Sequence, residues 1–92
     1  MVLGMYQIVY YSRITEDLNA ERQEFQRQEN DNEKFRLRRT ALHYVSECLE
    51  EFYRHLGYVT EKTVGGISCY KSEKTENGNR KITEVRIKVE KL

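Results

Sequence analysis

Two histidines and two glutamates recur at intervals of four residues in the middle of the chain, a pattern that could bind a metal or transfer protons. They are His43, Glu47, Glu51 and His55. Residues four apart stand on the same side of a helix, so these side chains would form one ridge. With Leu42 and Leu49 facing the core, Glu47 would lie nearly opposite them. We therefore expect a solvent-exposed ridge with no metal and no cofactor; the alternative is a site between two such ridges in a dimer.

The densest cluster of basic residues comes just before this ridge and consists of Lys34, Arg36, Arg38 and Arg39. A guanidinium group binds phosphate or carboxylate through paired hydrogen bonds, so Arg36 and Arg39 are candidate contacts to an anionic partner. Acidic residues stand immediately upstream, and cations near the start of a helix oppose its dipole. An ordinary solvated surface is therefore the competing interpretation of this cluster.

A second basic group, which includes Lys62, falls on the C-terminal strands described below. The candidate residues for RNA or DNA binding, taken from both groups, are Arg36, Arg39, Lys71, Arg86 and Lys88. Glu84 and Glu90 alternate with the cations of the last strand, and mixed charges favour solubility over phosphate binding. Stacking on bases needs exposed aromatic residues, and Tyr58 is the one expected on this face.

Seven tyrosines in a chain without tryptophan predict contact with another protein, because tyrosine is favoured in interfaces. Tyr44 and Tyr53 lie off the apolar stripe of the predicted helix. Either Tyr10 or Tyr11 must face away from the layer on which the first strand packs. The predicted protein-binding residues are therefore Tyr10, Tyr44, Tyr53, Arg36 and Arg39.

The sequence carries no recognisable catalytic motif: neither a serine nucleophile motif, a phosphate-binding glycine loop nor a zinc-protease motif is present. Cys48 and Cys69 form no closely spaced pair and have no histidine at zinc-finger spacing. We therefore predict no enzymatic activity and two reduced thiols, as is usual for a cytoplasmic protein. No apolar run approaches the roughly 20 residues of a membrane span.

The elements that must position these residues begin with residues 6–11, which are aromatic or β-branched on both faces and predict an interior strand. Thr15 and the acids after it predict a helix over 16–29. A second, stronger helix is predicted over 33–56 and ended by Gly57. The two apolar stripes differ in phase, and a capping break at 30–32 explains this. The alternative is one helix of about 40 residues.

Three strands should follow, with tight turns at Gly65-Gly66 and Asn77-Gly78. This register places Tyr70 opposite Val85. The face toward the helix, which receives Phe35, Leu42 and Leu49, would carry Val59, Thr63, Tyr70, Thr83, Val85, Ile87 and Val89. The opposite, mostly polar face would carry Thr60, Lys62, Cys69, Lys71, Glu84, Arg86 and Lys88.

A chain of 92 residues with 38% hydrophobic residues predicts a single domain, 1–92, with a thin core, so a second subunit could supply additional burial. The net charge of +1 gives no overall field that would attract nucleic acid or a membrane. Any such binding must come from a local patch.

The order of one strand, two helices and three antiparallel strands resembles the mRNA-cleaving and gyrase-targeting toxins of bacterial toxin–antitoxin modules. The last strand, 82–89, carries mixed charges where those toxins carry a basic catalytic or binding set. We predict an α+β domain, β-α-α-β-β-β, with a four-stranded, mainly antiparallel sheet and a helical layer on one face. We expect a cytoplasmic, non-enzymatic protein-binding or regulatory module of inhibitor type, as a homodimer. The alternative is an RNA- or DNA-binding protein or toxin-like nuclease.

Overall fold

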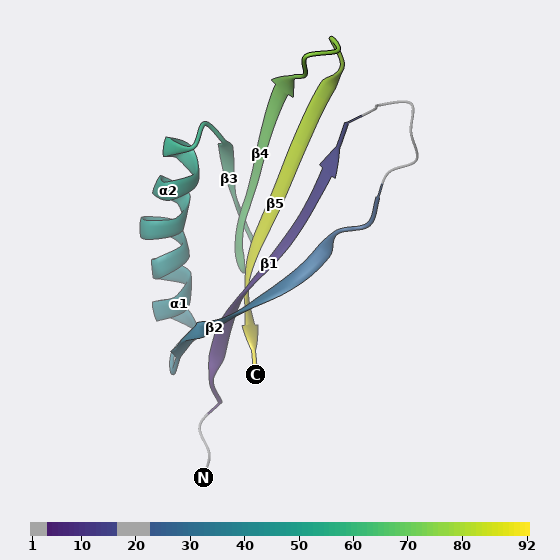
Figure 1. The fold of residues 1–92 in the computed structure, drawn as a ribbon. Coiled ribbons are helices and arrows are strands. Elements are labelled where there is room, and N and C mark those ends of the chain that lie inside the picture. Colours follow the sequence, from purple (N-terminus) through teal and green to yellow (C-terminus); the bar gives the residue numbers. More distant parts are fainter. Residues whose placement is uncertain (1–3, 17–22) are drawn as a thin grey trace.

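The computed structural model describes residues 4–16 and 23–92, and the backbone alone at 30–32. The described residues form an antiparallel sheet with a helical layer on one face (Figure 1). This confirms a small α+β domain with an antiparallel sheet. The order of the described elements is β-β-α-β-β-β, with five strands, and not the predicted four strands and two helices.

Strand β1 (Tyr6–Thr15) is an interior strand, as its sequence predicts. It pairs with β2 (Gln26–Phe35) on one side and with β5 (Arg80–Lys91) on the other. Ile8 and Val9 point to opposite faces of the sheet and both are 0% exposed. A strand that is apolar on both faces is thus placed between two other strands, where a side chain on each face is buried.

Strand β2 shows that the predicted helix over 16–29 is wrong, since its last residues, 26–29, pair with β1. Residues 17–22 of that helix lie outside the described part of the chain. The pairing shifts register between Gln7 and Val9, opposite residues 30–32, where the helix break was predicted. The polar residues 30–32 therefore mark an irregularity within a strand. Among the described strands β2 pairs with β1 alone, and an edge strand tolerates such polar sequence.

The helical layer is continuous and consists of α1 (Arg38–Tyr44), a π-helical turn η1 (Val45–Leu49) and α2 (Glu50–His55). It begins later than predicted because 33–35 belong to β2, and the single-helix alternative is also wrong. Its end is as predicted: Gly57 has φ +92° and donates to the Arg54 carbonyl oxygen at 2.9 Å. Such a left-handed residue closes a helix most easily when it is glycine. None of the described helices is long and apolar enough to cross a membrane.

The π-helical turn explains why the predicted apolar stripe fails beyond the middle of the helix. A wider turn inserts a residue and rotates later positions by roughly 100°. Val45 is buried and Tyr53 packs against the core, eight residues apart rather than seven. Phe52 and Leu56, expected near the stripe, are about half-exposed. Leu42 is only partly buried, and of the three residues predicted to meet the sheet, Phe35 and Leu49 pack on the core.

The three C-terminal strands are confirmed as β3 (Val59–Thr63), β4 (Gly66–Lys74) and β5, in the sheet order β2-β1-β5-β4-β3. Their register differs from the prediction by one residue, because Cys69, not Tyr70, pairs with Val85. The β3–β4 turn is Val64-Gly65, and residues 75–79 connect β4 to β5.

This shift exchanges the two faces of β3 and β4. Ile67 and Cys69 join Val85 and Ile87 in the core, and their burial is the physical reason for the observed register. Tyr70 lies on the face turned away from the helix, which we call the outer face. Val59 and Thr63 move to the outer face with it, whereas Thr60, Lys62, Cys69 and Lys71 lie on the helix side. Glu84, Arg86 and Lys88 occupy the outer face as predicted.

Candidate functional site

The ridge of histidines and glutamates lies in solvent. His43, Glu47, Glu51 and His55 are all exposed. His55 Nε2 lies 3.3 Å from Glu51 Oε1, a surface pair one helical turn apart. Over the described ranges, no group of three or more His, Cys, Asp or Glu side chains could hold a metal ion. An exposed pair of this kind contributes little to stability and forms no site by itself.

The tyrosines predicted to contact a protein are partly buried and pack against the core. Tyr44 lies 5.7 Å from Phe35 between ring centroids, and Tyr53 lies 5.1 Å from Tyr58. Burial raises the pKa of Tyr53 to about 12. Tyr10 also packs against the core. The prediction that Tyr44 and Tyr53 lie off the apolar stripe is therefore wrong, because both side chains pack against the core.

The five residues proposed to bind nucleic acid do not all lie together. Arg86 and Lys88 share the outer face, while Arg39 lies on the helix. Arg36 is exposed between β2 and α1. Lys71 points to the helix side and donates to the Leu56 carbonyl oxygen at 2.8 Å, which satisfies an orphan carbonyl at the end of the helix.

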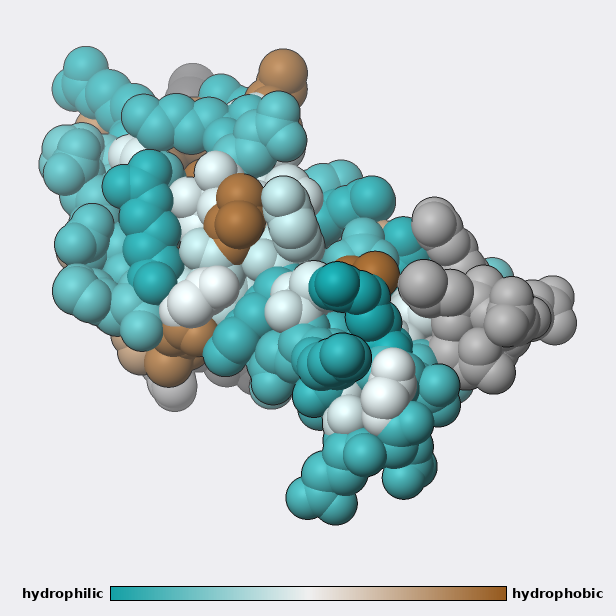
Figure 2. All heavy atoms as spheres, turned by 90° about the horizontal axis from the view of Figure 1, so that it is seen from above, coloured by the Kyte–Doolittle hydropathy of each residue, from teal (hydrophilic) through white to brown (hydrophobic). Residues whose placement is uncertain are grey.

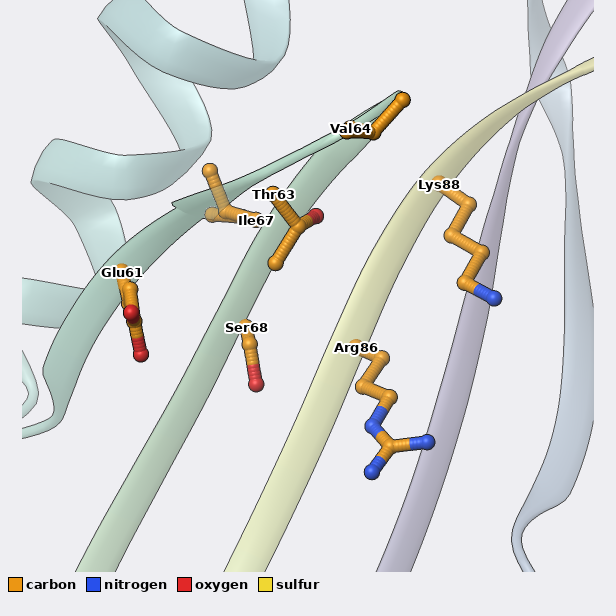
Figure 3. Close-up of a pocket in the computed structure, with 7 residues that line it drawn as sticks. All are labelled: Glu61, Thr63, Val64, Ile67, Ser68, Arg86 and Lys88. Carbon is orange, nitrogen blue, oxygen red and sulfur yellow. The ribbon is translucent and has the colours of Figure 1, made fainter.

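Arg86 and Lys88 line a hollow of about 400 Å³ on the outer face. The other residues that line it are Glu61, Thr63, Val64, Ile67 and Ser68. Figure 3 shows both cationic side chains extending from β5 to the same side of the sheet. The Arg86 guanidinium carbon lies 4.3 Å from the centre of the Phe25 ring, and Lys88 Nζ lies 5.4 Å from that of Tyr11. These rings orient the two cations without neutralising them.

The acidic residues that alternate with these cations are bound by other arginines. Arg13 of β1 binds Glu84 through two hydrogen bonds of 2.9 and 3.2 Å. Arg27 of β2 binds Glu90 at 3.1 Å. The Tyr11 hydroxyl and then Arg27 hold the pKa of Glu90 below its ordinary value. Sequence reasoning missed this, because it placed Arg27 in a helix rather than in a strand beside β1.

A second hollow of about 370 Å³ lies between the helix and β3. We call it the inner hollow; its polar lining residues are Arg39, His43, Ser46, Lys62 and Thr63. Arg39 and His43 stand one helical turn apart, and Lys62 reaches the same hollow from β3. Among the described residues, no carboxylate lines it. The sequence contained these residues, but the predicted register placed Lys62 on the other face.

The two hollows flank the Val64-Gly65 turn, and Thr63 lines both. The Arg38 guanidinium also reaches the turn, 3.5 Å from the position that a Cβ would take on Gly65. We call this region the basic end; it comprises Arg38, Arg39, His43, Lys62, Arg86 and Lys88. Across the described part of the chain, none of these six has an ion pair with a carboxylate. The lining of the two hollows includes one carboxylate, that of Glu61.

Comparison with protein families, with curated proteins and with solved structures found no match to this chain. The order of elements that resembles the bacterial toxins is also not the observed one, because a strand replaces the first predicted helix. The geometry of the basic end is therefore the basis for a functional proposal.

Proposed function

We propose that the protein binds single-stranded nucleic acid through the basic end. One observation carries this proposal: in the described part of the chain, cationic side chains that form no ion pair gather around the β3–β4 turn, although the whole chain has a net charge of only +1. Each phosphate that meets a lysine or arginine releases condensed counterions, which favours binding. The local concentration of charge matters for this term more than the total.

The outer face adds a surface on which a base can stack. Tyr70 is 49% exposed and lies on the same face as Arg86, because the observed register turns it away from the core. Stacking on an aromatic ring is tolerant of sequence and suits unpaired bases on a sheet. The open face of a sheet, with cations beside it, fits an extended strand better than a rigid duplex.

The proposal is binding without cleavage. Hydrolysis of RNA needs a general base and a general acid at one phosphate. Glu61 lines the outer hollow and His43 lines the inner one, so the β3–β4 hairpin separates these two groups. A toxin-like nuclease activity therefore has no support from the arrangement of these residues.

Fluorescence anisotropy with a labelled oligonucleotide of about 12 nucleotides tests the proposal. The double variant Lys62→Gln/Lys88→Gln removes one cation from each hollow and should weaken binding about tenfold at about 50 mM salt. For this variant, the slope of log affinity against log salt concentration should be shallower by roughly 1.4. The matched control, Lys74→Gln/Lys81→Gln, changes two lysines near the β4–β5 tip and should bind like the parent. Equal losses in the two variants would contradict a localised site.

A second candidate function is the protein-binding or regulatory role, of inhibitor type, with homodimerisation. It is favoured by half-exposed apolar residues at the other end of β3, namely Phe52, Leu56 and Val59. Figure 2, which shows the molecule from above the view in Figure 1, has hydrophobic residues at separate points on a mostly hydrophilic face. Free thiols at Cys48 and Cys69 fit a reducing cytoplasm.

Sedimentation equilibrium tests this second role. A dimer formed through the apolar end should dissociate in Phe52→Ser/Leu56→Ser, because both side chains would lose their burial against the partner. The basic-end variant Lys62→Gln/Lys88→Gln should leave the dimer intact. A parent protein that sediments as a monomer at all concentrations would remove homodimerisation from the proposal.

A further inference from the structure

The inner hollow differs from the outer one in charge and in position. Its described lining contains Arg39, His43 and Lys62 and no carboxylate, whereas Glu61 stands beside Arg86 and Lys88 in the outer hollow. The inner hollow lies between the helix and β3, while the outer hollow lies on the open sheet. A smaller hollow lined by Arg39, Thr40 and His43 adjoins it and adds a hydroxyl.

We propose that the inner hollow binds the terminal phosphate of the nucleic-acid strand, an inference that rests on the function proposed above. A phosphate monoester carries a charge of about −1.5 to −2 at neutral pH, whereas a phosphodiester within the chain carries about −1. Two cations and an imidazole match the greater charge of the monoester. The carboxylate of Glu61 opposes such a group in the outer hollow, which is better suited to the diesters that follow.

The hydrogen-bonding groups of the inner hollow are consistent with a phosphate ligand. The Ser46 hydroxyl donates to the His43 carbonyl oxygen at 3.2 Å, so its proton is already used within the helix. Thr63 and the cations are then the donors that remain, and a phosphate presents acceptor oxygens in several directions. Glu50, on the following helical segment, accepts hydrogen bonds from Arg54 and Thr60 and is not among the residues that line the inner hollow.

The position of Thr63 also explains how one nucleic-acid strand could occupy both hollows. It lines each of them, at the point where β3 enters the Val64-Gly65 turn. A strand whose terminal phosphate lies against Arg39 and Lys62 would therefore pass around this turn toward Arg86 and Lys88. The side chain of Val64 is 98% exposed at the turn and lines the outer hollow, so it would contact a nucleic-acid strand that takes this path.

The first test uses inorganic phosphate alone, with amide chemical shifts measured by NMR. Saturable shifts should be confined to residues 39–46 and 62–63 and should disappear in Arg39→Gln/Lys62→Gln. They should persist in Arg86→Gln/Lys88→Gln, a control that removes the same charge from the outer hollow. The amide spectrum of each variant also reports whether it remains folded. Shifts that are absent, scattered, or centred on the outer hollow would overturn the site.

The second test compares two oligonucleotides of identical sequence, one with a terminal phosphate and one with a terminal hydroxyl. The parent should bind the phosphorylated one about tenfold more tightly, and Arg39→Gln/Lys62→Gln should abolish that preference. Arg86→Gln/Lys88→Gln should weaken both to the same degree. Equal, measurable affinity for the two would overturn the terminal-phosphate inference while the proposed function stands. Binding of neither oligonucleotide would overturn the proposed function, and with it the nucleic-acid source of the phosphate.

Discussion

Glu50 brings a carboxylate into the contact between the helix and β3, where the residue is 5% exposed. Its Oε1 atom accepts hydrogen bonds from the Arg54 guanidinium and from the Thr60 hydroxyl. Its Oε2 atom is buried and has no hydrogen-bond partner in the described part of the chain. A buried charge with so few partners depends strongly on each of them.

Replacing Arg54 by methionine should therefore lower the free energy of unfolding by about 1–3 kcal/mol, as measured by urea denaturation. The exposure of the Arg54 side chain keeps the effect below that of a fully buried pair. Arg36→Met, at an exposed arginine, is the control and should change stability by less than about 0.5 kcal/mol. Glu50→Met/Arg54→Met should recover stability, since no charge is left buried. A double variant less stable than Arg54→Met would contradict this.

The two cysteines should differ sharply in reactivity. Burial, and then the charge of Glu50, raises the pKa of the Cys69 thiol to about 11, while Cys48 is exposed on the helix. At about pH 8 a thiol reagent should label Cys48 in the native protein and Cys69 only after denaturant is added. In Cys48→Ser, native labelling should nearly cease. Rapid native labelling of that variant would show that Cys69 is accessible.

Glu90 should make the stability of the protein depend on pH in the acidic range. Its pKa is lowered in the folded state, by the hydrogen bond from Tyr11 first and then by Arg27, from an ordinary value of 4.5. Glu90 therefore stabilises the folded state at a pH above its ordinary pKa. This contribution to stability is lost as the pH falls through the lower pKa of the folded state. Denaturation between about pH 5 and pH 3 should show a smaller loss for Glu90→Gln than for the parent. Parallel profiles of stability against pH for the two proteins would show that Glu90 makes no such contribution.

At the scale of elements, Gly66 allows β4 to approach β5 closely. A Cβ built on Gly66 would lie 1.8 Å from the Ile87 carbonyl oxygen, so the strands would have to separate. Gly66→Ala should destabilise the protein by more than about 3 kcal/mol in thermal or urea unfolding. Gly78→Ala is the matched control: its Cβ meets nothing within 4 Å, and only its positive φ of 82° opposes alanine. This control substitution should lower the free energy of unfolding by about 1 kcal/mol. Similar losses in both variants would contradict the close approach of the strands.

The sequence was sufficient to predict the elements whose signals are local. Residues 6–11 are apolar on both faces and became the interior strand, and Gly57 ended the helix where its conformational freedom predicts. Strand β2 was not predictable in this way, because its polar sequence carries no strand pattern and its stability comes from pairing with β1. The π-helical turn is likewise a product of packing, and it moved Phe52 and Leu56 toward solvent.

The candidate site depended on those same nonlocal features. Arg86 and Lys88 were predicted on the outer face from strand alternation alone, and the structure places them there. The pairing of Glu84 with Arg13 required knowledge that β5 lies beside β1. The inner hollow required the correct register of β3, because a shift of one residue moves Lys62 to the other face.

At the scale of the whole molecule, charge is separated although the total is nearly zero. The acidic residues of β5 bind arginines from β1 and β2, and cations that form no ion pair with any described residue remain around the β3–β4 turn. Half-exposed apolar residues lie at the opposite end of β3. Composition predicted the small net charge correctly, but the distribution of charge that carries the proposed function arises only on folding.

The most direct test of the central claim is an NMR titration of the parent protein with an unlabelled single-stranded oligonucleotide, followed through amide chemical shifts. If the basic end binds the strand, the largest shifts should cluster at residues 62–68 and 86–88 and on the helix at 38–46. Raising the salt from about 50 to 200 mM should reverse them. Shifts centred instead on Phe52, Leu56 and Val59, or no shifts at the lower salt, would contradict the account.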